Sequence, residues 1–136
     1  MLSRCLSNDT NVVKILLRNL SLDHDQIQQL LEIILEKRKI FELDLSNESS
    51  QSMNRFGSNM EIIEDFFRRN KTVAVMKLNN LALKKNGVDS IYRGISDNLI
   101  SNPIKVLCLK NNGINEHSIL SISAIAKSGI TSLDLS

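Results

Sequence analysis

Histidine and cysteine are the residue types in this chain that could supply a nucleophile or a soft metal ligand. The 136 residues contain two of each, His24 and His117 and Cys5 and Cys108. The cysteines form no CxxC pair and have no zinc-ligand spacing. The histidines open two predicted helices that lie three strand spacings apart, roughly 14 Å, which is too far for one metal ion to reach both. Cys108 has no histidine near it to act as a base. We therefore expect no catalytic residue, metal or cofactor, and no enzyme.

Positive charge is the second chemical feature, because lysines and arginines gather after three of the predicted helices. We call this set the basic ridge: Lys37, Arg38, Lys39, Arg68, Arg69, Lys71 and Lys127. Stacked helices would align these cations into a site for an acidic partner or a nucleic acid. Cations are also favoured at helix C-termini by the helix dipole. A net charge of only +2 gives the chain little general attraction for a nucleic acid, so the dipole is the ordinary explanation of these cations.

A recurring apolar spacing organises the rest of the chain. Five segments, starting near residues 12, 40, 73, 104 and 130, each place apolar residues at relative positions 1, 4 and 6. Positions 4 and 6 are two apart, so they share one face of a strand. The last anchors recur at intervals of about 30 residues, which indicates an internal repeat; they are Leu17, Leu45, Leu78, Leu109 and Leu135.

The intervals between these strands show the helical spacing of three and four. Asp23 with Gln26, and Ser58 with Glu61, are spaced to cap the first two helices. Strands that alternate with helices predict a parallel sheet, either doubly wound or built from stacked repeats, and the constant period favours the repeats. The residues predicted to face the core are Ile27, Leu30, Leu31 and Ile34; Ile62, Ile63, Phe66 and Phe67; Val88, Ile91, Ile95 and Leu99; and Ile119, Ile122 and Ala126.

Residues 104–114, IKVLCLKNNGI, match the leucine-rich-repeat signature LxxLxLxxNxL at every anchor. The chain resembles the ribonuclease-inhibitor-like subtype of that family. The resemblance implies an α/β solenoid, a horseshoe of four to five repeats with short parallel strands on the concave face and helices on the convex face. It also implies that Asn112 turns inward to hydrogen-bond the loop leaving the strand. In the earlier repeats Leu20, Glu48 and Leu81 take that position, and Asn47 and Asn80, one residue earlier, could substitute.

The repeat pattern also sets the expected boundaries. Residues 1–11 form an N-terminal cap segment and residues 12–136 form the repeat domain, whose last repeat is incomplete. Residues 46–59, SNESSQSMNRFGSN, are longer and more polar than the family norm. We expect a protruding or mobile loop there.

The resemblance implies a partner-binding surface on the concave face, formed by the residues that flank the anchors. Both signs of charge and a small apolar strip of Leu16, Val75 and Val106 suit a protein partner better than a uniformly charged polymer. We therefore expect a protein–protein interaction module. The predicted partner-binding residues are Lys14, Leu16, Arg18, Glu42, Asp44, Ser46, Val75, Lys77, Asn79, Val106, Cys108, Lys110 and Asp134, with Ser132 beside them.

Other functions stay open. One is a recognition or regulatory fragment of a larger protein, such as a microbial secreted effector or a ubiquitin-ligase-type enzyme; another, less favoured, is a nucleic-acid binder that uses the basic ridge. The last strand, with Leu133 and Leu135, has a repeat on one side only, which predicts self-association. The chain shows no signal-peptide pattern and no membrane-spanning stretch. We expect no membrane partner and a cytoplasmic or other intracellular location, which includes delivery into a host cell.

Overall fold

The chain folds into alternating strands and helices. The computed structural model describes residues 14–37, 39–48, 54, 56, 60–98 and 102–135, so the predicted cap segment 1–11 lies outside the described residues. The elements are, in chain order, β1 (Lys14–Leu16), α2 (His24–Lys37), β2 (Glu42–Asp44), α3 (Glu61–Arg69), β3 (Val75–Lys77), α4 (Lys84–Ser96), β4 (Val106–Cys108), the 3-10 helix η1 (Glu116–Ser118), α5 (Ile119–Ala126) and β5 (Ser132–Asp134). None of the described helices is long and apolar enough to cross a membrane.

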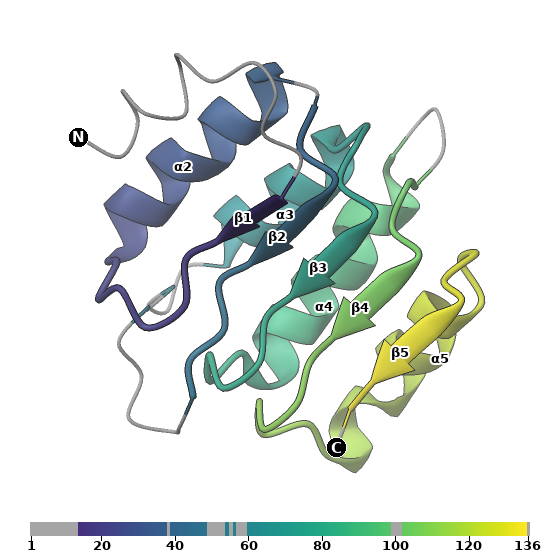
Figure 1. Ribbon diagram of the computed structural model, residues 1–136. Helices are drawn as coiled ribbons and strands as arrows, with labels where there is room; N and C mark the ends of the chain where they lie inside the picture. The colour runs from purple at the N-terminus through teal and green to yellow at the C-terminus, as the bar shows by residue number, and fades with distance from the viewer. Residues whose placement is uncertain are drawn as a thin grey trace.

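The strands form one sheet in which they follow the order of the sequence, from β1 to β5. Every neighbouring pair is parallel, and helices α2 to α5 lie on the same face of the sheet (Figure 1). The predicted anchors align in one row across the strands: Ile15, Leu43, Met76, Leu107 and Leu133. The predicted α/β alternation with parallel strands is therefore confirmed.

The core lies between the sheet and its helices. Leu43, Leu45, Leu107 and Leu109 are completely buried within one continuous cluster of apolar side chains. At β5 the packing is looser, because Leu133 is only partly buried and Leu135 is exposed. Among the described residues β5 pairs with β4 alone, so its anchors lack a second neighbouring repeat.

The helical spacing places the first three helices correctly. The predicted residues of α2 and α3 are buried, as are Val88, Ile91 and Ile95 of α4, whereas Leu99 lies outside the described residues. Asp23 and Gln26 form the predicted cap: Gln26 N donates to Asp23 Oδ1 at 2.9 Å and Asp23 N donates to Gln26 Oε1 at 3.0 Å. This reciprocal pair satisfies two N–H groups that the first turn leaves free.

Two helix predictions are wrong in position. Helix α3 starts at Glu61 after Met60, so Glu61 holds the first helical position and not the third that pairing with Ser58 requires. In α5, Ile119 and Ala126 are exposed and Ile125 is buried. The 3-10 helix η1 delays the start of α5, and buried Ser118 takes the first inward position. The inward spacing i, i+4, i+7 then falls on Ile122 and Ile125.

Asn112 turns inward as predicted. It is almost completely buried, and its Oδ1 accepts from Leu81 N at 2.8 Å and from Leu83 N at 3.3 Å. Its Nδ2 donates to Leu78 O at 2.7 Å. The side chain thus joins the loop of its own repeat to the strand end and the loop of the preceding repeat.

Asn54 makes the equivalent contacts between the first and second repeats. Its Nδ2 donates to Leu17 O at 2.8 Å and to Leu45 O at 3.0 Å, and its Oδ1 accepts from Leu22 N at 3.1 Å. Asn80 makes a different bond to the preceding repeat, because its Nδ2 donates to Asn47 O at 2.8 Å. Asn47 instead holds Asn54 in place, since its Oδ1 accepts from Asn54 N at 3.0 Å and its Nδ2 donates to Asn54 O at 3.0 Å.

In the described part of the 46–59 stretch, Ser46, Asn47, Asn54 and Phe56 are buried and Glu48 is exposed. Asn54 and Phe56 therefore do not protrude, and the expected protruding or mobile loop at the remaining residues stays a prediction. Relative to the fourth repeat, this stretch contains six additional residues before Asn54. The inward asparagine and the next apolar residue, Phe56, therefore keep the two-residue spacing of Asn112 and Ile114. Residues 49–53, 55 and 57–59 lie outside the description.

Candidate binding surface on the open face of the sheet

The sheet face that points away from the helices brings together the residues predicted to bind a partner. Along each strand these residues alternate with the buried anchors, so they point to the opposite face; we call it the open face (Figure 1). One row across the strands holds Lys14, Glu42, Val75, Val106 and Ser132, and the next holds Leu16, Asp44, Lys77, Cys108 and Asp134. Arg18, Ser46, Asn79 and Lys110 follow one residue beyond the buried anchors.

Glu42 is the centre of the first charge cluster. Its Oε2 lies 3.3 Å from Lys14 Nζ and 3.6 Å from Lys77 Nζ, so one carboxylate on β2 attracts cations from both neighbouring strands. The parallel register produces this arrangement, because it places Glu42 beside Lys14 and one step diagonally from Lys77.

A second set of polar contacts lies along the edge of the sheet where the strands end. Arg18 Nε lies 3.7 Å from Asp44 Oδ2, and Lys110 Nζ lies 3.3 Å from Asp134 Oδ2. Asp44 is buried and its Oδ1 accepts from Ser46 N at 2.9 Å. Buried Ser46 in turn accepts from Asn79 N through its Oγ at 2.9 Å. Asp44 and Ser46 therefore support the surface from below, whereas Arg18 and Lys110 are exposed on it.

Cys108 lies on β4 within the open face and is half-buried. Burial raises the pKa of the thiol above its ordinary value, and the nearby Lys77 opposes this effect. A raised pKa leaves less thiolate at neutral pH than an ordinary cysteine has, which is the reverse of what a nucleophile needs.

The histidines stand in separate places. His24 Nδ1 lies 3.4 Å from Asp25 Oδ1 at the start of α2, and His117 Nε2 lies 4.0 Å from Glu116 Oε1 in η1. Within the described ranges, no group of three or more His, Cys, Asp or Glu side chains could hold a metal ion.

The arginines of the basic ridge are engaged with carboxylates on the helix side. Arg69 donates to Glu32 Oε1 at 2.7 Å and to Asp65 Oδ2 at 2.8 Å, and Arg68 donates to Asp65 Oδ1 at 2.7 Å. These hydrogen bonds, the one to Glu32 first, raise the pKa of Arg69 above its ordinary value. Arg38 lies outside the described residues. Carboxylates of α2 and α3 therefore lie beside Arg68 and Arg69. Their negative charge weakens the attraction of the basic ridge for a polyanion.

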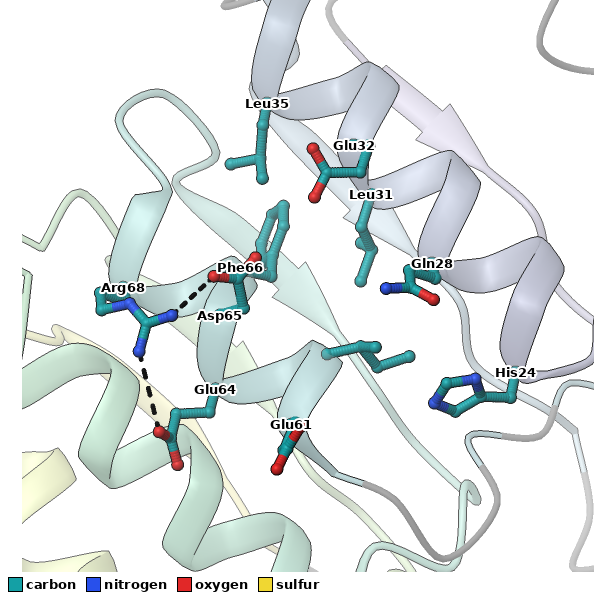
Figure 2. A pocket seen from close by; sticks show the side chains of 11 residues that line it. His24, Gln28, Leu31, Glu32, Leu35, Glu61, Glu64, Asp65, Phe66 and Arg68 are labelled. Atoms are coloured by element: carbon teal, nitrogen blue, oxygen red, sulfur yellow. Dashed lines mark hydrogen bonds and ion pairs between the residues drawn. The ribbon is translucent and has the colours of Figure 1, made fainter.

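A groove of about 400 Å³ lies between α2 and α3 on the helix side. Figure 2 shows His24 and Gln28 on one of its walls and Glu61, Glu64 and Asp65 on the other. Glu64 and Asp65 are paired with arginines, so these two carboxylates add little net negative charge to the groove. No sequence pattern predicts this groove, because it depends on the spacing between two helices.

A scan against protein-family models and a search of the curated proteins each return no match to this chain. The residues of the open face and their geometry are therefore the basis on which a function is proposed.

Proposed function

We propose that this chain is a leucine-rich-repeat protein of the ribonuclease-inhibitor-like type that binds another protein on its open face and carries out no chemistry. The repeated strand register supports the family assignment. Further support comes from Asn112 and Asn54, which bond the strand ends and loops of the preceding repeats in the same way. On this proposal the sheet curves into a horseshoe and the open face is its concave side.

The observation that carries the binding role is the composition of the open face. Lys14 of β1, Lys77 of β3 and Lys110, which follows β4, share the open face with exposed Leu16 and half-buried Val75 and Val106. In the described part of the chain all helices lie on the other face. Apolar side chains ringed by charged groups are typical of protein-binding surfaces. Short strands hold these side chains rigidly, so little conformational entropy is lost when a partner docks.

The role of the open face can be tested with a bulky substitution that leaves the charges unchanged. Val106→Trp places an indole ring on β4 within the open face, and Ser123→Trp places the same ring on the exposed surface of α5. We expect Val106→Trp to reduce the capture of partner proteins from a cell lysate by at least about ten-fold, a loss of 1.4 kcal/mol. Quantitative mass spectrometry of immobilised wild-type and variant chains measures this ratio.

The control decides what a loss of capture means. Ser123→Trp should retain the same partners at wild-type levels, and circular dichroism should show that both variants are folded. If Ser123→Trp removes the partners and Val106→Trp keeps them, docking takes place on the helix side and the proposal is wrong.

We also propose self-association at the β5 edge. Ile119, Leu120 and Leu135 are exposed there, and α5 contains no charged residue. Pairing two such edges would extend the sheet and cover these side chains. Light scattering should therefore show a mass that rises with concentration, and Leu120→Lys with Leu135→Lys should return the chain to a monomer. A wild-type chain that stays monomeric at millimolar concentration contradicts this proposal.

A further inference from the structure

Across β1 to β3 the charged groups of the open face lie at two depths, whereas Lys110 and Asp134 at the β4–β5 end are exposed to similar extents, 45% and 39%. The side chains of the four cations are between 36% exposed, for Lys77, and 53% exposed, for Lys14. The carboxylates of Glu42 and Asp44 are only 14% and 7% exposed. A molecule that approaches this part of the face therefore meets ammonium and guanidinium groups first.

The cations are also held in position with hydrogen-bond donors to spare. Glu42 Oε2 accepts no hydrogen bond from the lysines 3.3 and 3.6 Å away, and Arg18 lies 3.7 Å from Asp44. Each ammonium has three donors and a guanidinium has five. The buried carboxylates thus orient these cations and leave the N–H donors of the cations available. On the helix side, by contrast, hydrogen bonds of 2.7 and 2.8 Å occupy donors of Arg69.

We propose that the open face binds an acidic segment of a partner protein, an inference that rests on the proposed function. One partner carboxylate can bridge Lys14 and Lys77, because both ammonium nitrogens lie within 3.6 Å of the same Glu42 oxygen. Arg18 and Lys110 can donate hydrogen bonds to further carboxylates of the segment. Leu16 and Val106 can contact the aliphatic side chains that lie between those carboxylates. A basic segment would meet the exposed cations and be repelled.

A protein segment fits this face better than a nucleic acid does. The four cations stand against three carboxylates, Glu42, Asp44 and Asp134, so the face has little net charge to attract a polyphosphate. The exposed side chain of Leu16 gains more from an aliphatic partner than from a sugar–phosphate backbone.

The test is a titration of the full ¹⁵N-labelled chain with matched synthetic peptides, followed by nuclear magnetic resonance. The probes are a peptide of alternating Glu and Val, one of alternating Lys and Val, and a single-stranded oligothymidylate. We expect the Glu–Val peptide to shift the amide signals of Leu16, Lys77, Cys108 and Lys110. The Lys–Val peptide should shift none of them at the same concentration.

Matched variants separate the open face from the basic ridge. Lys14→Gln with Lys77→Gln should weaken binding of the Glu–Val peptide about five-fold, the size expected for two partly exposed ion pairs. Lys71→Gln with Lys127→Gln removes the same charge from the helix side and should leave binding unchanged. Lys110→Gln, which leaves Glu42 with both of its lysines, supplies a second open-face variant if the double variant is unstable.

Each contrary result has a distinct meaning. Equal or tighter binding of the Lys–Val peptide, no shift with the Glu–Val peptide at millimolar concentration, or shifts confined to the helix side overturn the acidic-segment proposal. Tighter binding of the oligothymidylate on the open face assigns that face to nucleic acid and overturns it as well. The capture experiment with Val106→Trp is independent of charge, so the open face can be upheld as a docking surface even where the acidic segment is rejected.

Discussion

Replacement of Leu109 by alanine lowers the expected free energy of unfolding by about 2 to 5 kcal/mol. The Leu109 side chain is completely buried in the core cluster, so its truncation removes apolar burial and leaves a cavity. The backbone bond from Leu109 N to Asp134 O, 2.7 Å long, does not involve the side chain and should persist. Urea unfolding followed by circular dichroism measures the change.

Leu20→Ala is the matched control for this prediction, because Leu20 lies outside the surface proposed for self-association. The same atoms are removed from a side chain that is 51% exposed in the loop after β1, and the expected change is under about 0.5 kcal/mol. A loss under 0.5 kcal/mol for Leu109→Ala itself would show that the leucine is not enclosed between repeats, and the strand register would then be wrong.

Asn54→Ala should destabilise the chain by about 3 kcal/mol or more. Three buried backbone groups lose their partner at once, Leu17 O, Leu45 O and Leu22 N. Each buried polar group left without a hydrogen bond costs roughly 1 to 3 kcal/mol. Asn112→Ala should have a similar effect, because Asn112 makes the corresponding bonds between the third and fourth repeats.

Asn86→Ala tests whether the effect belongs to the inward position or to asparagine in general. Asn86 is exposed on α4, so its replacement should change the free energy of unfolding by less than about 0.5 kcal/mol. Unfolding curves that are the same for Asn54→Ala and Asn86→Ala would mean that Asn54 does not bridge the repeats in solution.

The sequence predicted the elements that depend on short-range periodicity. Strand anchors two residues apart and helix residues three and four apart identify their faces without any knowledge of the neighbours. The inward face of α5 was predicted wrongly because this helix, with sequence ILSISAIA, is apolar around most of its circumference. Periodicity cannot choose an inward face where two opposite faces are equally apolar.

Asn54 was missed for a different reason. The pattern search placed the inward asparagine three residues after each last anchor, and the insertion moves it to nine residues after Leu45. The signal that could have found it is the pair Asn54 and Phe56, which repeats the spacing of Asn112 and Ile114. The repeat pattern placed Glu42 and Lys77 on the same face of the sheet, but the depths of their charged groups depend on side-chain conformations that no sequence pattern specifies.

The strictly consecutive order of the strands bears on how the chain folds and opens. Each strand pairs only with the segments that precede and follow it in the sequence, so closing any one pair requires a loop of about 30 residues and never the whole chain. Because each repeat contacts only its neighbours, one repeat can unfold while the others stay folded. In the monomer the amides of β5, which have partners on one side and loosely packed anchors, should exchange with deuterium before those of β2 and β3. We therefore expect β2 to β4, which pair on both sides among the described strands, to stay folded longest.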